Sequence, residues 1–312
     1  MMDSLGICFV LYAGPEMAST RYRAIVPGKV LGRRGYHVIA GEPDPNFDVF
    51  VFSKHFNPVD PETATVLKQK GKTIIYDVCD YHFEGKHRDH YLRMCDLAHV
   101  VTCTTEQMRE YIKEFTDRDA EVIPDPVEFP VAKPRFDPED PVRLFWYGNL
   151  ANLDTLEPII PQIEGLTLTV VTNRELEFNR TGSTYCRAWS PKAMFEGYLN
   201  SDIVIVPTIN DNRRKLVKSH NRVSEAIRQG HYVCAGPLPS YEQFAPWMYI
   251  GDIRKGIDWA LEHPDQVREN IATAQDYVAD HFDPEVIGSR WEETIKRSTS
   301  QESPGLTSLA EL

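Results

Sequence analysis

Short apolar runs alternate with segments of helix length along most of this chain. The clearest run, Asp202–Val206, is continuously apolar and β-branched after its first residue, which is typical of a strand buried on both faces of a parallel sheet. Pro207 ends it. Strands separated by helix-length segments imply βαβ units. We therefore predict an α/β fold with two Rossmann-like, doubly wound parallel sheets.

The predicted elements cover both halves of the sequence. Strands are expected at Gly6–Leu11, His37–Ala40, Asp48–Ser53, Lys72–Val78, His99–Cys103, Glu121–Ile123, Val142–Tyr147, Leu166–Thr172, Tyr185–Trp189, Asp202–Val206, near Val233 and at Met248–Ile250. Helices are expected at Thr20–Arg34, Pro61–Gln69, Gly85–Cys95, Thr105–Phe115, Asn152–Ile163, from Ser190, at His220–Gln229, Ile253–Glu262, Pro264–His281 and Pro284–Arg297.

Six prolines between positions 124 and 141 exclude a helix or a central strand there. We predict a first domain at residues 1–130, a linker at 131–141 and a second domain at 142–297 that includes the terminal helices. Residues 298–312, rich in Ser, are predicted to be a disordered tail, with partner binding as the alternative. The two domains are expected to face each other across a cleft.

The charge balance limits the kinds of partner. The 312 residues carry 46 Asp and Glu against 34 Lys and Arg, a formal net charge of −12, which disfavours nucleic-acid or anionic-lipid binding through overall charge. A local basic patch still allows peripheral membrane contact. No apolar stretch is long enough to span a bilayer, and the six scattered cysteines resemble buried hydrophobes of a reducing compartment. We expect a cytoplasmic protein without a metal site.

One basic cluster stands out against this acidic background. Five cations lie within ten positions: Arg213, Arg214, Lys215, Lys218 and Arg222. Ser219 is a candidate N-cap and Gly230 a candidate C′ residue for the helix between them. A helix N-terminus with added cations suits a phosphate or diphosphate, with Asn221 in its first turn.

Glu225 lies one turn further along the same helical face, four residues after Asn221. Its carboxylate could accept hydrogen bonds from sugar hydroxyls. The alternative is a solvated basic loop with Glu225 in a surface ion pair.

Ligands of open parallel sheets bind beyond the carboxyl ends of the strands. The strand ends in the first half of the chain are therefore candidate ligand-binding positions as well. Arg21 and Arg23 open the helix after the first strand and suit an anionic or hydroxyl-rich group, unless they only face solvent. Asp80 and His82 follow the Lys72–Val78 strand and could supply a general base or hold a sugar hydroxyl. A structural histidine or a helix-capping aspartate is the alternative for these two.

Two further strand ends lie in the second domain. Gly148 and Asn149 follow the Val142–Tyr147 strand, where a glycine lets the backbone approach a ligand closely. Trp189 could stack on a nucleobase or belong to the core. The first strand is not followed by Gly-x-Gly-x-x-Gly, so an NAD site is not expected.

Several segments form a characteristic series: Ser19–Ala24, Leu31–Val38, Tyr76–Asp80, Thr102–Met108, Val122–Val127, Phe145–Asn149, Ser201–Pro207 and, most strongly, Lys218–Ala226 running on to Gly230 and Val233. In order and spacing this series resembles the GT-B glycosyltransferases, especially the bacterial group-1-like, nucleotide-sugar-dependent ones. The resemblance spans nearly the whole chain.

This resemblance implies a division of labour between the domains. The second would bind a nucleoside-diphosphate-sugar donor, with Glu225 on the ribose and Ser219–Arg222 facing the diphosphate. The first would bind a glycan, lipid-linked or small-molecule acceptor. Members of the family usually need no bound metal, since cations and a helix N-terminus offset the charge of the leaving diphosphate. No cofactor beyond the donor is therefore expected.

The sequence departs from the family pattern at two places. Retaining members commonly carry a second glutamate where this chain has Val217, and many have an Arg and a Lys within the stretch that here is Gly148–Asp154. Lys215, Lys218 and Arg222 could substitute for those cations. Alternatively the donor site is altered, which leaves open a catalytically silent GT-B-like module or a sugar-nucleotide epimerase. The stereochemistry, retaining or inverting, stays open.

Overall fold

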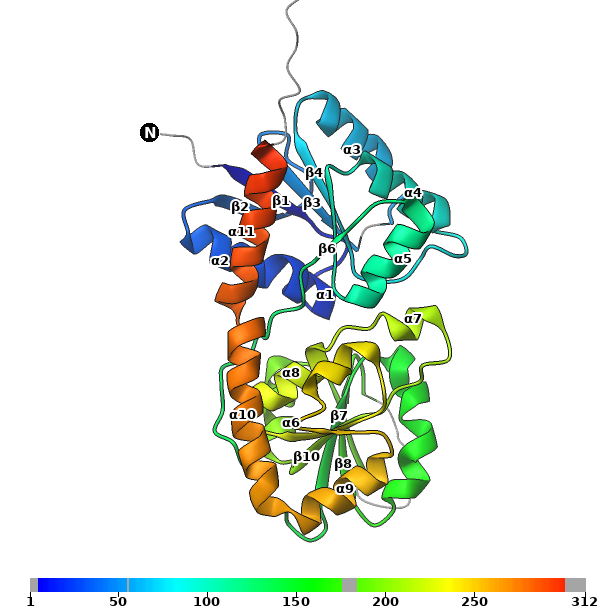
Figure 1. Cartoon of the computed structure of the whole chain (residues 1–312), viewed down its shortest axis with the longest axis vertical. Helices are drawn as coiled ribbons and strands as arrows, with labels where there is room; N and C mark the ends of the chain where they lie inside the picture. Colours follow the sequence, from blue (N-terminus) through cyan, green and yellow to red (C-terminus); the bar gives the residue numbers. More distant parts are fainter. Residues whose placement is uncertain (1–4, 55, 176–183, 301–312) are drawn as a thin grey trace, which may run out of the picture. The chain divides into compact units, whose positions relative to one another are not determined.

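The computed structural model describes residues 5–54, 56–175 and 184–300, which form two compact units. The first unit combines the chain up to Pro126 with the segment from Pro284 onward, and the second is Val127–Asp283. Each is built on a parallel six-stranded sheet, as the alternating pattern predicts (Figure 1).

The first sheet has the strand order β2-β1-β3-β4-β5-β6. Its strands are β1 (Gly6–Val10), β2 (His37–Gly41), β3 (Val49–Ser53), β4 (Thr73–Val78), β5 (Val100–Cys103) and β6 (Glu121–Val122). The strands β1, β3 and β4 are fully buried, as expected for strands covered on both faces. The helices are α1 (Ala18–Thr20), the π-helical η1 (Arg21–Ile25), α2 (Val26–Arg33), α3 (Asp60–Gln69), α4 (Arg88–Leu97), α5 (Glu106–Thr116) and α11 (Pro284–Ser300).

The second sheet has the order β12-β11-β10-β7-β8-β9. Its strands are β7 (Arg143–Tyr147), β8 (Thr167–Thr172), β9 (Thr184–Ala188), β10 (Ile203–Val206), β11 (Tyr232–Ala235) and β12 (Tyr249–Ile250). The helical elements are η2 (Leu150–Thr155), η3 (Glu157–Ile163), α6 (Pro191–Leu199), α7 (Arg213–Leu216), α8 (Asn221–Arg228), η4 (Pro239–Phe244), α9 (Ile253–Glu262) and α10 (Pro264–Phe282).

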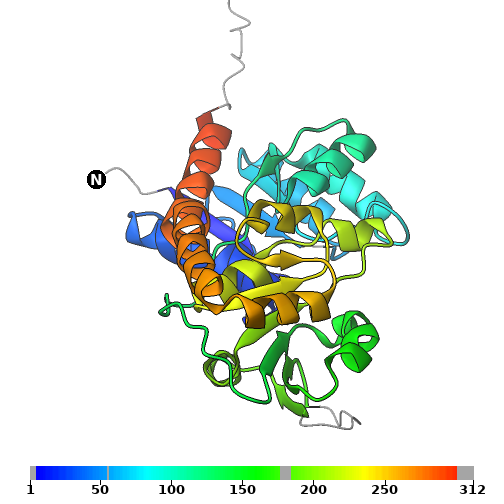
Figure 2. The ribbon, with the colours of Figure 1, turned by 60° about the horizontal axis from the view of Figure 1, so that its bottom comes forward.

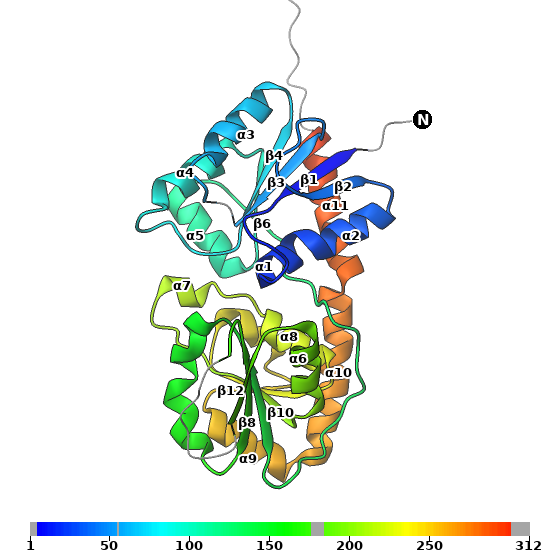
Figure 3. The same ribbon diagram turned by 180° about the vertical axis from the view of Figure 1, so that it is seen from behind.

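Successive side chains of β7 divide between two cores, because neighbouring residues of a strand point to opposite faces. Phe145 packs with Met194 of α6 and Val223 of α8 on one face. Trp146 packs with Ile163 of η3 and Ile257 of α9 on the other. Helices accordingly flank this sheet on both sides (Figures 2 and 3). The sheet edge beyond Tyr147 and Val206 is left for loops and for the start of α8.

The last helix, α11, belongs to the first unit, which corrects the predicted boundary at residue 297. Its residues Ile287, Trp291 and Ile295 recur every four positions and are fully buried in the core around β1. Trp291 meets Phe9 edge to face, with 5.8 Å between ring centroids. Figure 1 shows α11 beside α2. The sequence shows the helical period of α11, but it does not show which of the two sheets this helix covers.

The proline-rich stretch 131–141 is not a free linker, which corrects the second boundary. It lies within the second unit. The Ala132 N–H donates to the Arg228 carbonyl at 3.0 Å, the Arg135 N–H donates to the Gly230 carbonyl at 3.1 Å, and Phe136 is 2% exposed. Without helix or sheet bonds of its own, this extended segment is held by bonds to the end of α8.

The predicted tail begins later than residue 298. Helix α11 continues to Ser300, and Ser298 is buried, with its hydroxyl donating to the Ile295 carbonyl at 2.8 Å. Residues 301–312 lie outside the described part of the chain. Of the helices that the structure describes, none combines the length and apolar character that crossing a membrane requires.

Candidate functional site

The end of β7 meets the first turn of α8 at the carboxyl edge of the second sheet. A Cβ added to Gly148 would lie 3.6 Å from Nη1 of Arg222 and 3.1 Å from the Trp146 ring. The Tyr147 hydroxyl donates to the Arg222 carbonyl at 2.9 Å. The fold thus brings together Gly148 and Arg222, two residues that the sequence analysis assigned to a donor site.

Arg222 carries a donor group that is not used within the described chain. Its Nη1 is buried and has no hydrogen-bond partner among the described residues. A buried guanidinium N–H without a partner is costly, and an anionic oxygen is its preferred acceptor. The spare donor lies beside a residue without a side chain and in the first turn of a helix, where the macrodipole also favours an anion.

Two tyrosines form a hydrogen-bonded chain to the first turn of α8. The Tyr198 hydroxyl of α6 donates to the Tyr147 hydroxyl at 2.8 Å, and Tyr147 in turn donates to the Arg222 carbonyl. Burial raises the pKa of Tyr147 well above its ordinary value, so the phenol stays protonated and keeps donating. The sequence does not predict this pair, because no local pattern links a strand residue to a helix residue 51 positions away.

The predicted cation Lys215 is engaged within the unit. Its Nζ lies 2.9 Å from Oδ2 of Asp154 in η2. The side chain of Lys215 is 21% exposed and that of Asp154 50%, so this pair is partly solvated. The charge of Lys215 is therefore compensated. Lys218 is half-buried, and its backbone carbonyl accepts a hydrogen bond from the Ser240 hydroxyl at 2.7 Å.

The start of α8 differs from the prediction by one residue. His220, not Ser219, occupies the N-cap position, and the Ser219 hydroxyl accepts from the Asn221 N–H at 3.2 Å. His220 is 2% exposed and packs against Phe244 and Phe282, and its burial lowers the imidazole pKa to about 3. A neutral histidine anchors the helix start in the core. The predicted C′ residue is correct, since Gly230 has φ +77°.

Glu225 is buried, which contradicts both predictions for it, a contact with sugar hydroxyls and a surface ion pair. The residue is 1% exposed. One carboxylate oxygen accepts from the Glu128 N–H and the other from the Phe129 N–H at 3.4 Å. Burial raises its pKa to about 8. Through these two hydrogen bonds the Glu225 side chain holds residues 128 and 129 against α8.

Asn149 and Trp189 are placed at strand ends, as predicted. The side-chain Oδ1 of Asn149 accepts from the Ala151 N–H at 2.9 Å and caps η2. Trp189 follows β9 and packs, partly buried, against the core. Its stacking on a nucleobase stays a prediction.

In the first unit, Arg23 is a core residue, which corrects its predicted role on the acceptor side. It is 0% exposed. Its guanidinium donates to both oxygens of Asp77, at 2.7 and 3.0 Å, lies 3.3 Å from Asp125 and stacks over Trp291 at 5.3 Å. Arg21 instead donates to the carbonyls of Pro15 and Glu16, at 2.9 and 3.1 Å, and fixes the turn after β1.

Asp80 and His82 lie at the carboxyl edge of the first sheet, as predicted. The carboxylate of Asp80 is 2.8 Å from Nζ of Lys54, and both side chains are 22% exposed. His82 packs against Phe56, with ring centroids 5.4 Å apart. Lys54 was not singled out from the sequence. Its distinguishing feature is a backbone φ of +56°, which is unusual for a residue with a side chain and has no local sequence signal here.

No family model matches the sequence, and no curated protein matches it. Solved structures do match in fold. The Anabaena protein HepE in complex with UDP-glucose superposes with a TM-score of 0.71 at 11% identity, over 94% of this chain and all (100%) of that one. The two six-stranded parallel sheets agree with that two-domain architecture. This chain has the GT-B fold.

Two other GT-B matches cover a similar share of the chain. AviGT4, a glycosyltransferase involved in avilamycin A biosynthesis, matches with a TM-score of 0.59 at 13% identity over 95% of this chain and 98% of that one. An α-glucosyltransferase in complex with UDP and a 13-mer DNA containing an HMU base matches at 0.63 and 9% identity, over 96% and 100%. At such identities the likeness concerns the fold.

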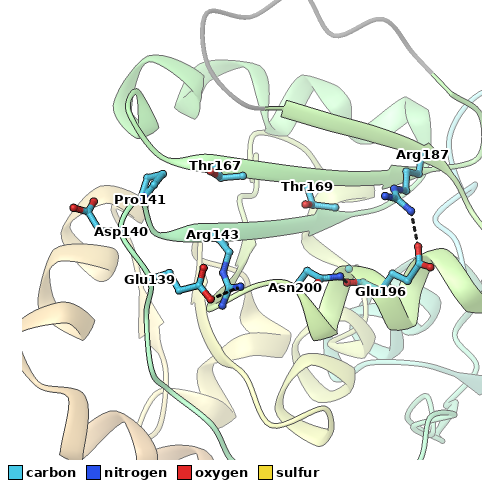
Figure 4. Close-up of a pocket in the computed structure, with 10 residues that line it drawn as sticks. Glu139, Asp140, Pro141, Arg143, Thr167, Thr169, Arg187, Glu196 and Asn200 are labelled. Carbon is cyan, nitrogen blue, oxygen red and sulfur yellow. Dashed lines mark hydrogen bonds and ion pairs between the residues drawn. The ribbon is translucent and has the colours of Figure 1, made fainter.

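A separate pocket of about 380 Å³ lies at the amino ends of β7 and β8 (Figure 4). Its walls include Arg143, Thr167, Thr169, Arg187 and Asn200. Arg143 pairs with Glu139 at 3.0 Å and with Asp202 at 2.7 Å, and Arg187 pairs with Glu196 at 2.5 Å. Its two cations are therefore compensated, and the pocket contains none of the predicted donor residues of this GT-B chain.

Proposed function

We propose that this protein is a glycosyltransferase that moves a sugar from a nucleoside-diphosphate-sugar donor to a hydroxyl group of an acceptor. The observation that carries the proposal is the buried, unpartnered Nη1 of Arg222 beside Gly148 at the start of α8. A diphosphate oxygen is the kind of acceptor such a group prefers. The GT-B fold, which the matched UDP-bound structures also have, supports the proposal of a nucleoside-diphosphate-sugar donor.

In the proposed reaction, the acceptor oxygen bonds to the anomeric carbon while the bond from that carbon to the donor phosphate oxygen breaks. The acceptor loses its proton, and the nucleoside diphosphate leaves with the electron pair. Arg222, Lys218 and the N-terminus of α8 would offset the negative charge that develops on the diphosphate, without a bound metal ion. Asp80 and His82 are the candidates to receive the proton or orient the acceptor hydroxyl.

Nucleotide binding tests the donor site directly. We expect UDP to raise the melting temperature of the wild-type protein, since a ligand that binds only the folded state stabilises it. Arg222→Ala should remove most of this rise. Arg254→Ala is the matched control, because Arg254 is a 44% exposed arginine of the same unit paired with Asp258. Absence of protection by UDP and by the other nucleoside diphosphates would count against the proposal.

A second function is favoured by Val217. This residue occupies the position of the family's second glutamate and is 0% exposed, in the core. A chain without that carboxylate could bind a nucleotide sugar yet not transfer it, as a silent GT-B-like module. Incubation with UDP-glucose, UDP-galactose and UDP-N-acetylglucosamine, with and without acceptor sugars, separates the two. Release of UDP that Arg222→Ala abolishes would eliminate the silent module, and epimerised donor without acceptor would indicate the epimerase.

A further inference from the structure

Aromatic side chains and an ion pair follow the strands at the carboxyl edge of the first sheet. Tyr12 follows β1, Phe56 follows β3, and His82 follows β4. The ring centroids of Tyr12 and Phe56 are 4.4 Å apart, and those of Phe56 and His82 are 5.4 Å apart. His87, before α4, lies 4.5 Å from Phe56. Three strand ends therefore contribute to one aromatic group at the edge where ligands of such sheets bind.

Lys54 and Asp80 form the polar part of this group. Their Nζ–Oδ2 distance is 2.8 Å, and each side chain keeps 22% of its surface exposed. Burial lowers the pKa of Lys54, but attraction to Asp80, with smaller contributions from Cys79 and Tyr12, outweighs it and the net shift is upward. The amine is therefore charged and held in place by a carboxylate that is also accessible.

The backbone of Lys54 is held in a conformation that side chains disfavour. Its φ is +56°, and its N–H donates to the Asp77 carbonyl at 3.1 Å. Left-handed backbone is energetically unfavourable for a residue other than glycine, and such residues cluster at active sites and ligand-binding positions. At Lys54 this backbone carries the amine that pairs with Asp80.

The charges at this place favour a neutral ligand over an anionic one. The cation of Lys54 is compensated by Asp80, so the pair offers donors and acceptors without net charge. An exposed ring, such as Tyr12 at 42% exposure, offers a flat apolar face. A pyranose matches both features, because one face of its ring carries C–H groups while its edge carries hydroxyls.

We propose that Tyr12, Phe56 and the Lys54–Asp80 pair form a binding site for a pyranose ring, stacked on the aromatic side chains and hydrogen-bonded through adjacent hydroxyls. Naming this sugar as the acceptor rests on the proposed glycosyltransferase function. The site then assigns the acceptor to the carbohydrates, with a sugar hydroxyl close to Asp80.

Saturation-transfer NMR tests this site without a donor. The probes are the methyl glycosides of glucose, galactose, mannose and N-acetylglucosamine, each added to the full chain. We expect ring C–H signals of at least one glycoside to receive saturation, and the affinity to fall at least about tenfold in Phe56→Leu and in Lys54→Gly, the loss of roughly one good polar or stacking contact. Lys54→Gly removes the amine and tolerates the positive φ.

Val66→Ala serves as the matched control, because Val66 is a 49% exposed apolar residue of α3 outside this group. Melting curves with and without UDP report separately whether each variant folds and keeps its donor site. No saturation of any probe, or saturation that persists in both site variants, would overturn the inference. Sugar binding without protection by UDP or by any other nucleoside diphosphate would sustain this site while contradicting the proposed function.

Discussion

The guanidinium of Arg23 donates hydrogen bonds to both carboxylate oxygens of Asp77, at 2.7 and 3.0 Å, in the interior of the first unit. The hydroxyls of Ser53 and Thr102 donate to the same carboxylate at 2.7 and 2.8 Å. Burial alone would raise the pKa of Asp77, but Arg23 and these hydroxyls outweigh it and the net shift is downward. The pair is thus an ionised, fully bonded centre that joins β3, β4, β5 and η1.

Removing Arg23 should strongly destabilise the first unit. Arg23→Met leaves the Asp77 carboxylate buried without its cation, and such losses cost about 3–5 kcal/mol. Arg33→Met is the control, since Arg33 pairs with Glu285 at the surface, where side chains 60% and 55% exposed contribute about 1 kcal/mol or less. Urea unfolding compares the two, and equal midpoints would contradict a structural role for Arg23.

Stability should depend on pH through Glu225. Its folded-state pKa of about 8 lies above the ordinary value of 4.5, so between these values the folded chain keeps a proton that the unfolded chain has lost. This contribution is complete below about pH 4.5 and is lost as the pH rises through 8. We expect the melting temperature of the wild type to fall relative to Glu225→Gln from about pH 5 to pH 8. Parallel curves would show that Glu225 does not titrate this way.

Gly148 should matter more for nucleotide binding than for folding. In Gly148→Ala the new Cβ would lie 3.1 Å from the Trp146 ring and would stand beside Arg222 where a phosphate is expected. We expect a stability loss of about 1 kcal/mol but a fall in UDP affinity of about tenfold or more, measured by calorimetry. Gly32→Ala, with no atom within 4 Å of the added Cβ, should leave UDP binding unchanged. Unaltered affinity in Gly148→Ala would argue against a phosphate at this place.

Gly230 should be the most sensitive helix-terminating glycine of the second unit. Its φ is +77°, and an added Cβ would meet the Lys133 carbonyl oxygen at 2.2 Å. Gly165 has a similar φ of +85° but no atom within 4 Å of such a Cβ. Gly165→Ala should cost only the left-handed strain of about 1–2 kcal/mol, and Gly230→Ala clearly more. Thermal denaturation that ranks the two equally would contradict the contact with the 131–141 segment.

Most of the fold could be predicted from local sequence patterns, namely apolar runs and turn residues. The β-branched run Ile203–Val206 forms β10, and the other predicted strands lie within about two residues of those found, because period and turn residues are properties of neighbouring positions. The same holds for Gly230 at the end of α8 and for the strand-end positions of Gly148, Asp80 and His82.

What the sequence by itself determined is therefore the two parallel sheets, their order of elements and the strand ends at which to look for a site. Tertiary structure alone decided which charged residues are available there. Arg23 meets Asp77 across 54 positions and Glu225 meets the Glu128 N–H across 97, and each is buried by that contact. The local sequence around a charged residue near a strand end is the same whether its side chain faces a ligand or a distant protein partner. Its burial depends on chain segments that only folding brings together.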